Sequence, residues 1–469
     1  MEMRSREFKS RAVYYIHDGA LQKAMGLLRD GFVAKRTQQA AELPEFEALR
    51  EEARQLKNHI LDHLDHYLTR YESTVKAAGG QVHWARDAAE AREIILGICR
   101  RVNARTVTKG KSMVSEEIGL NEALLENGME VVETDLGEYI IQLANEPPSH
   151  IIAPAVHKTK DQVSDLFQEA HGTERKTTVP DLVNEARHVL REKYFRADVG
   201  ITGGNYLVAE TGSSVIVTNE GNGDLTQTLA RVHIVTSGIE RVVPRLDDVT
   251  LFLRLLARSA TGQETETYTT VSTGPRHADD KDGPEEYHVV LVDNGRSKML
   301  GGRFREMLRC IRCGACMNHC PVYGSVGGHA YGWVYPGPMG SVLTPLIKGL
   351  DNAYDLPNAC TLNGRCASVC PVKIPLPDLL RELRHLQHRQ HLTPAVQRHA
   401  LSVWRFVATR PSLYHFGERL AARLLALAGR RKGRLRSLPL ASAWTDARDL
   451  PAPAGKTFLE QWHARKSQS

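Results

Sequence analysis

The sequence lacks long hydrophobic runs, an apolar segment near its start, and cysteines spread along the chain. None of its 469 residues belongs to an uninterrupted apolar stretch of the roughly 18 residues that a membrane-spanning helix needs. The first residues, MEMRSREFKSRAVYY, contain no apolar signal core. Seven of the eight cysteines lie between residues 310 and 370, which argues against a disulfide scaffold and indicates metal ligation in a reducing compartment. We therefore expect a cytoplasmic protein.

A fingerprint for flavin or nicotinamide cofactors is also absent, because no G-x-G-x-x-G follows a predicted strand. The nearest pattern to a phosphate loop is R-T-V-T-K-G-K-S at 105–112, in which Arg105 replaces the first glycine. We interpret this segment as a strand-to-helix turn capped by Ser112 or Ser115.

Acidic residues are scarce at the C-terminal end, and the net charge of +6 hides this imbalance. Residues 381–469 contain 17 Lys or Arg and 5 Asp or Glu, so they carry +12 while the rest of the chain carries −6. Two interpretations remain open: a solvated basic tail, or a docking surface for an acidic partner or for anionic lipid at the inner face of the membrane. Nucleic acid is not expected as a partner, since no aromatic-rich binding motif accompanies the charge.

Sequence patterning predicts four regions. Residues 1–75 lack proline apart from Pro44 and predict a helical N-terminal arm. Residues 76–295 alternate short β-rich runs with helical segments, which predicts an α/β domain with a largely parallel sheet. Residues 300–385 hold the cysteine runs among helical segments and predict an α-helical ferredoxin domain with two clusters. Residues 390–469 predict a basic helical C-terminal region.

Within the α/β region the predicted strands are Gln81–Trp84, Thr106–Thr108, Glu130–Glu133, His150–Ala153, Tyr206–Ala209, Ser214–Thr218, His233–Thr236 and His288–Val292. The predicted helices between the early strands are Ala88–Arg101 and Ser115–Glu126. The polar stretch Ser259–Glu286 is predicted to be a long surface loop.

The first cysteine run has the spacing C-x2-C-x2-C-x3-C-P. Three thiolates this close, Cys310, Cys313 and Cys316, can surround one cubane iron–sulfur cluster, and Cys320, fixed by Pro321, points towards a second cluster. Structural zinc sites instead use pairs of C-x2–4-C knuckles, which this run does not match. The run therefore predicts iron–sulfur ligation.

The second run, C-x5-C-x3-C-P, repeats the first with Asn363 at the position equivalent to Cys313. In a two-cluster arrangement the ligands cross over between the runs. The first cluster then takes Cys310, Cys313, Cys316 and Cys370, and the second takes Cys320, Cys360 and Cys366.

The second cluster is one thiolate short, and three explanations stay open. Asn363, a water or another group completes a [4Fe-4S] cluster; the cluster holds three irons as [3Fe-4S]; or Cys99, the remaining cysteine, reaches the site. Cys99 lies in the apolar stretch IILGIC, which is typical of a small core residue. The spacing resembles the three-iron run of succinate dehydrogenase iron–sulfur subunits, but we favour four irons with an unusual fourth ligand.

A further candidate site is the Gly-rich segment at residues 200–222. Such loops at strand ends can bind an anion through backbone N–H groups. Glu210 lies between a predicted strand and a turn, where a catalytic carboxylate can stand. The alternative is that the glycines serve tight turns and that Glu210 is a solvated loop residue.

Several segments together resemble the family of lactate utilisation protein B, the iron–sulfur subunit of a bacterial complex that oxidises L-lactate. The resemblance extends over nearly the whole chain. The segments are T-K-G-K-S-M-V-S-E-E at 108–117, E-T-D-L-G-E-Y-I-I-Q-L at 133–143, G-I-T-G-G-N-Y-L-V-A-E-T-G-S at 200–213, C-I-R-C-G-A-C-M-N-H-C-P-V-Y at 310–323 and C-P-V-K-I-P-L at 370–376.

The resemblance implies that residues 76–295 form a LUD domain, with a fold similar to the NagB/RpiA/CoA-transferase group. It implies two partner subunits, another iron–sulfur protein and a second LUD protein. The family usually has cysteine at the place of Asn363, for which Cys360 can substitute. The implied cluster ligands are Cys310, Cys313, Cys316, Cys320, Cys366 and Cys370.

We therefore predict a non-catalytic electron-transfer subunit of a cytoplasmic complex that oxidises L-lactate to pyruvate. One alternative is that the LUD domain itself is an enzyme, with Glu210 and the Gly-rich loops as its active site and the clusters as accessories. Another is an iron–sulfur subunit for a different 2-hydroxy acid such as glycolate. A third is a mainly structural scaffold.

Overall fold

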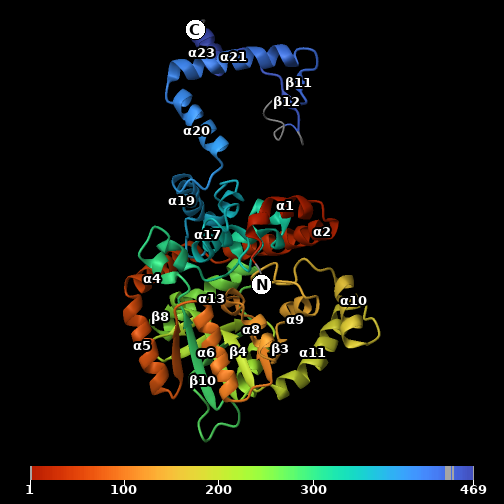
Figure 1. Cartoon of the computed structure of the whole chain (residues 1–469), viewed down its shortest axis with the longest axis vertical. Coiled ribbons are helices and arrows are strands. Elements are labelled where there is room, and N and C mark those ends of the chain that lie inside the picture. The colour runs from red at the N-terminus through yellow and green to blue at the C-terminus, as the bar shows by residue number, and fades with distance from the viewer. Residues whose placement is uncertain (1–2, 439–444, 446–447, 468–469) are drawn as a thin grey trace. The chain divides into compact units, whose positions relative to one another are not determined.

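The computed structural model describes residues 3–438, 445 and 448–467 (Figure 1). The chain forms two compact units, residues 1–386 and 387–469. The first unit contains two sheets, the helices around them and all eight cysteines.

A six-stranded sheet forms the centre of the first unit, in the order β1-β10-β7-β4-β2-β3, and every neighbouring pair is parallel. Its strands alternate between two cores: Ile234 and Val290 face one, while Val235 and Val289 face the other. Burial of both faces by helices is what a parallel sheet requires. The strands are β1 (Gln81–Ala85), β2 (Thr106–Lys109), β3 (Glu130–Glu133), β4 (Val199–Gly203), β7 (Val232–Gly238) and β10 (Glu286–Val292).

The helices of the α/β region begin at side chains suited to capping. Asp87 accepts from the N–H groups of Ala89 and Glu90 at the start of α6, and Ser112 accepts from the N–H of Ser115 at the start of α7. The helices are α6 (Ala88–Arg101), α7 (Met113–Ile118), α8 (Leu120–Glu126), α9 (Leu136–Leu143), α10 (Lys160–His171), α11 (Val179–Arg196), α12 (Asn222–Leu229), α13 (Leu246–Ala260) and α14 (Arg296–Leu300), with the 3-10 turn η3 (Ile239–Arg241).

The direction of strand addition reverses between β2 and β4, which lie side by side. The chain moves from β2 to β3 at one edge, returns to β4, and then continues through β7 and β10 towards the other edge. In open parallel sheets the crevice beyond the carboxyl ends of the strands at such a reversal is where ligands bind.

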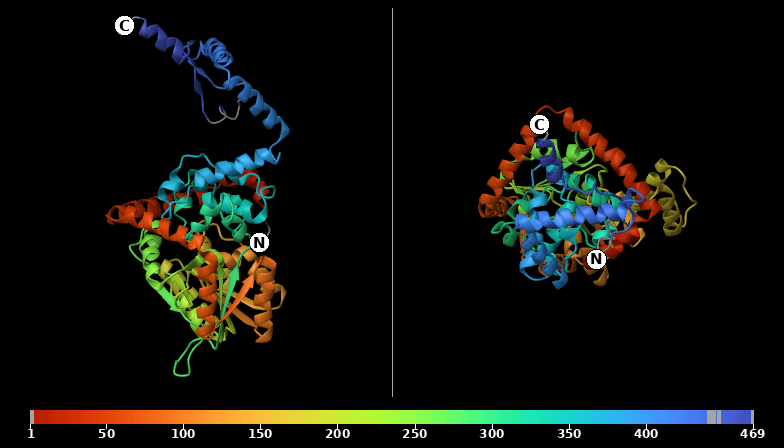
Figure 2. Two further views of the ribbon diagram at one scale, coloured as in Figure 1. Left: turned by 90° about the vertical axis from the view of Figure 1, so that its left-hand side faces the viewer. Right: turned by 90° about the horizontal axis from the view of Figure 1, so that it is seen from above.

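A smaller four-stranded sheet has the order β8-β5-β6-β9. Its strands are β5 (Tyr206–Val208), β6 (Ser213–Thr218), β8 (Val242–Val243) and β9 (Tyr268–Ser272). The segment between β9 and β10, green in Figure 2, extends beyond the larger sheet.

The N-terminal segment is helical and runs along the outside of the first unit, red in Figure 2. Ile60, Leu61, Leu64 and Leu68 recur at helical spacing and are all buried. Its elements are η1 (Ser5–Glu7), α1 (Phe8–Ile16), α2 (Gly19–Leu28), η2 (Arg29–Val33), α3 (Ala34–Ala41), α4 (Phe46–Asp62) and α5 (Leu64–Ala77).

The cysteine runs lie among short helices. One hydrophobic core contains side chains of this segment, of the N-terminal helices and of the smaller sheet, so the three pack together. The elements are η4 (Arg305–Arg309), α15 (Ala315–Asn318), α16 (Pro321–Val326), η5 (His329–Tyr331), α17 (Gly337–Lys348), η6 (Leu356–Asn358), α18 (Arg365–Val369) and α19 (Leu376–Arg389).

The second unit exposes many large apolar side chains. Trp404 is 65% exposed, Phe416 64% and Phe458 74%, so these helices have unpaired apolar surface. Its elements are α20 (Ala395–Ala408), α21 (Pro411–Gly429), β11 (Arg434–Leu435), β12 (Leu450–Pro451) and α23 (Phe458–Lys466).

Three local predictions are wrong. The helix predicted over Ser115–Glu126 is divided into α7 and α8, because Gly119 between them has a left-handed backbone with φ 67°. Residues His150–Ala153 form bends instead of a strand, since the backbone N–H groups of Ile152 and Ala153 donate to His150 Nδ1. The stretch Ser259–Glu286 is not all loop, because β9 within it pairs with β6. The polar composition of β9 hid it, since an edge strand with exposed residues needs no hydrophobic run.

We expect His233 to make stability depend on pH. Its imidazole is buried, Nε2 lies 2.8 Å from Thr202 Oγ1, and burial lowers its pKa to about 3. The unfolded chain takes up this proton near pH 6.5, so the free energy of unfolding falls as pH decreases from 6.5 towards 3. Between pH 6.5 and 5 this single group contributes a loss of about 2 kcal/mol.

The measurement is urea unfolding of the full chain at pH 6.5 and 5. His233→Gln should show a shallower dependence on pH than the wild type, whereas His17→Gln, at an exposed position, should match the wild type. Equal slopes for the wild type and His233→Gln would contradict the assignment.

Candidate metal centre and adjoining cavity

Four of the cysteines line one small cavity. They are Cys310, Cys313 and Cys316 of the first run and Cys370 of the second, here called the Cys310 group. Burial raises the pKa of the Cys316 thiol well above its ordinary value, and the neighbouring Cys310, Cys313 and Cys370 add to this effect. The structure thus brings together the four residues that the crossover pattern assigns to the first cluster, while ligation itself stays a prediction.

The other three cysteines, Cys320, Cys360 and Cys366, form the Cys320 group. Burial, together with the neighbouring Cys360 and Cys320, raises the pKa of the Cys366 thiol to about 12. Burial also raises the pKa of Cys320, and Cys360 adds to this effect. The structure therefore brings together the three thiols predicted for the second cluster. Thiols that lie this close together lose their protons when a metal binds. Thiolate is the soft donor that iron–sulfur clusters take. Both groups of cysteines therefore have the ligand chemistry that such clusters need.

The two runs repeat one local conformation. Arg312 and the equivalent Leu362 both have positive φ, 61° and 56°. The N–H of Arg312 lies 3.4 Å from Cys310 Sγ, and the N–H of Leu362 lies 3.3 Å from Cys360 Sγ. Backbone donors aimed at the sulfur atoms stabilise their negative charge. The duplication is therefore structural as well as a repeat of cysteine spacing.

Asn363 breaks the repeat. Its side chain is exposed, and Oδ1 accepts from the N–H of Arg365 at 3.1 Å, at the start of α18. Cys99 lies elsewhere, fully buried on α6 in the core beneath the larger sheet. The structure thus brings neither Cys99 nor a further cysteine to the Cys320 group.

Arginines from the N-terminal helices bind the backbone of the second run. Arg50 donates to the carbonyl oxygen of Cys370 through Nη2 at 2.7 Å and to that of Ser368 at 2.8 Å. Arg36 donates to the carbonyl oxygen of Val369 at 3.1 Å. These contacts fasten the backbone around Cys370 to the N-terminal helices and place two positive charges close to the thiols.

A larger cavity of about 520 Å³, here called the strand-end cavity, opens at the carboxyl ends of β2, β3 and β4. It lies where the direction of strand addition reverses. Its lining includes Gly203, Gly204 and Gly223, which belong to the Gly-rich region or follow it directly. A Cβ on Gly203 would lie 3.2 Å from Ser112 Oγ, so glycine there allows close packing of the two loops.

Glu210 does not line this cavity. It is exposed, and its Oε2 accepts from the N–H of Leu246 at 3.2 Å, at the start of α13. This contact is that of a helix-capping residue. The catalytic role considered for Glu210 stays a prediction.

The strand-end cavity and the cavity of the Cys310 group share part of their walls. Arg312 and Ile151 line both. The guanidinium of Arg312 lies 4.3 Å from the ring centre of Tyr335, and its Nη2 is 3.8 Å from Glu240 Oε1. A molecule in the larger cavity is therefore separated from the Cys310 group by only a thin layer of side chains.

Glu240 is the centre of a buried charge network at this wall. Its Oε2 lies 2.7 Å from Arg296 Nε, and its backbone oxygen accepts from Lys57 Nζ at 2.6 Å. Burial alone would raise the pKa of Glu240, but Arg296, Arg241 and Arg312 lower it to about 2. Sequence reasoning missed these residues, since isolated Arg and Glu residues far apart in the chain carry no spacing signal.

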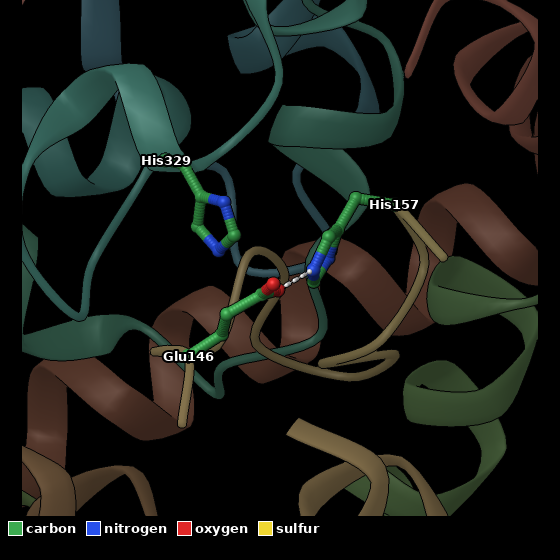
Figure 3. A group of neighbouring side chains, drawn as sticks. All are labelled: Glu146, His157 and His329. Atoms are coloured by element: carbon green, nitrogen blue, oxygen red, sulfur yellow. Dashed lines mark hydrogen bonds and ion pairs between the residues drawn. The ribbon is translucent and has the colours of Figure 1, made fainter. Parts of the chain in front are cut away.

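Glu146, His157 and His329 form another polar group (Figure 3). His157 Nε2 lies 2.7 Å from Glu146 Oε2, and the ring centres of His157 and His329 are 4.4 Å apart. Such residues can bind a divalent metal. Here Lys158 Nζ lies 2.5 Å from Glu146, and His329 Nε2 lies 2.8 Å from the carbonyl oxygen of Pro147. We interpret the group as a polar contact between a loop and the cysteine segment.

Three family models match the chain. A LUD domain matches residues 68–292, a 4Fe-4S dicluster domain matches residues 306–374, and "Lactate utilisation protein B, C-terminal" matches residues 381–467. Lactate utilization protein B from Lysinibacillus sphaericus is 42% identical over 100% of this chain and 98% of its own length. The Bacillus pumilus protein of that name is 41% identical over 100% and 99%.

The chain belongs to the lactate utilization protein B family. Another relative, the uncharacterized electron transport protein YkgF of Escherichia coli, is 41% identical over 98% of this chain and 97% of its own. Among solved structures, a DUF162 family protein from Deinococcus radiodurans aligns with 49% of this chain at 16% identity and a TM-score of 0.29.

Membership of this family and the 4Fe-4S domain support the assignment of this chain as an iron–sulfur protein with a role in lactate utilization. The mixed α/β architecture with a parallel sheet, the LUD domain and the ferredoxin-like 4Fe-4S region agree with the sequence analysis. Among the described residues, no helix has both the length and the apolar character needed to span a bilayer.

We predict that Cys360, and not Asn363, is required for the second cluster. Cys360→Ala should lose about half of the bound iron, because it leaves two thiols in the Cys320 group. Asn363→Ala should keep the wild-type iron content, because the side chain of Asn363 serves the backbone of α18. Iron and sulfide analysis with Mössbauer spectra of anaerobically purified protein makes the measurement.

The matched control is Cys99→Ala, which should retain all iron. About seven irons per wild-type chain would mean that the second cluster is [3Fe-4S], and a loss of iron in Asn363→Ala would make Asn363 a ligand.

Proposed function

We propose that this chain is the iron–sulfur electron-transfer subunit of a complex that oxidises L-lactate to pyruvate. The observation that carries the proposal is the pairing of the Cys310 and Cys320 groups through crossed runs, beside a cavity at the strand ends. The names of the relatives support it, since several are lactate utilization proteins and one is an electron transport protein.

The cysteines would hold two clusters, with Cys310, Cys313, Cys316 and Cys370 around the first. We favour [4Fe-4S] for both. When bound, such clusters accept and donate single electrons. The chain's own contribution is to hold the thiols, to aim the N–H groups of Arg312 and Leu362 at sulfur, and to place Arg36 and Arg50 nearby. The N–H groups and the two guanidinium groups stabilise negative charge, which favours the reduced form.

The partners we propose are a second iron–sulfur protein and a second LUD protein. One of them would carry the cofactor that oxidises the hydroxy acid, since this chain has no flavin or nicotinamide fingerprint. Glycolate, another 2-hydroxy acid, is the alternative substrate.

A second candidate function is catalysis by the LUD domain itself, favoured by the strand-end cavity. Glu210 is exposed and outside the cavity lining, so it is a weak choice for the catalytic group. Lost turnover with intact clusters in Glu210→Gln would favour this alternative.

We expect L-lactate to reduce the clusters of the complex. The chain is purified anaerobically with its natural partners, and EPR spectra are recorded after L-lactate, D-lactate or glycolate is added. Reduction within the turnover time by L-lactate alone is the expected result. The isolated chain is the control and should remain oxidised. Clusters that stay oxidised in the complex would contradict an electron-transfer role.

We also propose that the second unit docks a partner subunit. Its exposed apolar side chains, including Trp404, Phe416 and Phe458, accompany the excess of basic residues in this region. Aromatic residues and arginine are enriched at protein interfaces. Contact with anionic lipid is the alternative for the same surface.

Deleting residues 391–469 should leave the cluster content unchanged and weaken assembly by at least tenfold, measured by co-purification and sedimentation. A Trp404→Ser/Phe416→Ser variant should reproduce the loss, whereas Arg431→Gln/Lys432→Gln should affect it less. Normal assembly of the deleted chain would refute docking, and loss of binding to anionic vesicles alone would assign the surface to lipid.

A further inference from the structure

Arg241 is a buried guanidinium with few partners. The residue is 8% exposed and lines the strand-end cavity. Its nearest carboxylate contact is 4.0 Å, from Nε to Glu240 Oε1, and none of its five N–H donors makes a hydrogen bond to a described residue. Burial lowers the pKa of Arg241. Donors left unpaired inside a protein cost free energy that a ligand or ordered water recovers.

The acidic groups of the same cavity are already engaged. Asp135 Oδ2 lies 3.2 Å from Lys111 Nζ, and Glu220 Oε2 accepts from the N–H of Leu136 at 3.0 Å. Glu266 Oε1 accepts from the N–H of Ala257 at 3.1 Å. The carboxylates therefore have donors, whereas Arg241 lacks an acceptor, and this imbalance favours an anion over a cation as the ligand.

The rest of the cavity is suited to an organic molecule. Leu256, Ala257 and Ala260 of α13 form an apolar wall, and Ile140 and Ile216 are further apolar lining residues. A volume of about 520 Å³ lies within the range of small-molecule sites, which combine apolar walls with a few polar groups. A guanidinium binds a carboxylate through two parallel N–H···O bonds.

We propose that the strand-end cavity binds the carboxylate of a 2-hydroxy or 2-oxo acid on Arg241, next to the Cys310 group. The class of acid rests on the proposed function; the anionic character rests on Arg241. Arg312, which lines both cavities, lies between the ligand and the cysteines. The cavity is large enough for acids with more than three carbon atoms. The apolar wall therefore determines which carbon-chain lengths bind.

The test is calorimetric titration of the full chain, with its clusters, under anaerobic conditions. The probes are L-lactate, pyruvate, 2-hydroxyhexanoate and inorganic phosphate. Saturable binding of at least one carboxylate is expected, with phosphate at least tenfold weaker. Arg241→Gln should weaken binding of the carboxylate at least tenfold. Leu136→Trp, which narrows the cavity at a half-buried position and keeps Arg241, should weaken it as well.

The matched control is Arg258→Gln. Arg258 is also 8% exposed, but it binds Gln39 and does not line the cavity. The affinity of the Arg258→Gln variant for the carboxylate should stay within twofold of that of the wild type. Iron content and circular dichroism verify folding, and if Arg241→Gln fails to fold, Leu136→Trp alone decides. Bound carboxylate should also make the reduction potential of one cluster more negative, since like charges repel.

Four results would overturn the proposal: no saturable binding, equal affinity in Arg241→Gln, equal binding of phosphate, or a shifted cluster potential in Arg241→Gln without a change in affinity. The last would mean that Arg241 only offsets the charge of the thiolates. Lactate-dependent reduction of the complex without binding here would leave the proposed function standing and refute this site. Binding in the strand-end cavity without lactate-dependent reduction of the complex would support this site and refute the proposed function.

Discussion

The structure depends on holding Cys370 beside the first cysteine run, although 49 residues separate it from Cys320. This contact cannot come from local spacing, because the segment between the runs folds into several short helices of its own. Both runs pack in one hydrophobic core with the N-terminal helices, and Arg36 and Arg50 of these helices bind the carbonyl oxygens around Cys370. The N-terminal helices therefore support the candidate metal centre, even though they carry none of its proposed ligands. Their shared hydrophobic core with the cysteine segment and the smaller sheet explains why these parts form one compact unit.

Much of the fold was predictable because hydrophobic periodicity and capping residues act locally. The strand Glu130–Glu133 and the helix Ala88–Arg101 have the bounds that the sequence predicted. The failures at His150–Ala153 and at β9 have a common physical reason, which is that contacts made in the folded chain decided the local conformation. His150 accepts hydrogen bonds from its own loop and so prevents a strand, whereas β9 is a strand because β6 lies beside it.

The candidate site divides in the same way. Cysteine spacing indicated which thiols of each run belong together, and the crossover of ligands in two-cluster proteins indicated that Cys370 joins the first run and Cys320 the second. It could not indicate the strand-end cavity, which results from the reversal of strand order between β2 and β4. Nor could it indicate Arg241 and Glu240, whose importance comes from burial and from neighbours distant in sequence. Gly-rich loops did identify part of the cavity wall, but Glu210 shows that a carboxylate near such loops can face solvent and cap a helix.

The two cysteine groups differ in their surroundings, and this difference gives the proposed path a direction. The Cys310 group adjoins the strand-end cavity through Arg312 and lies near the buried charges around Glu240. Beside the Cys320 group, the neighbouring Leu362 and Asn363 are exposed. Solvent and partner subunits therefore reach the second group more easily than the first. If electrons enter near the cavity, the Cys320 group is the natural point of exit. The substitution of Asn363 for a cysteine then falls at the exposed end of the path, where a water can reach a cluster, and leaves the buried end with its full set of four thiols.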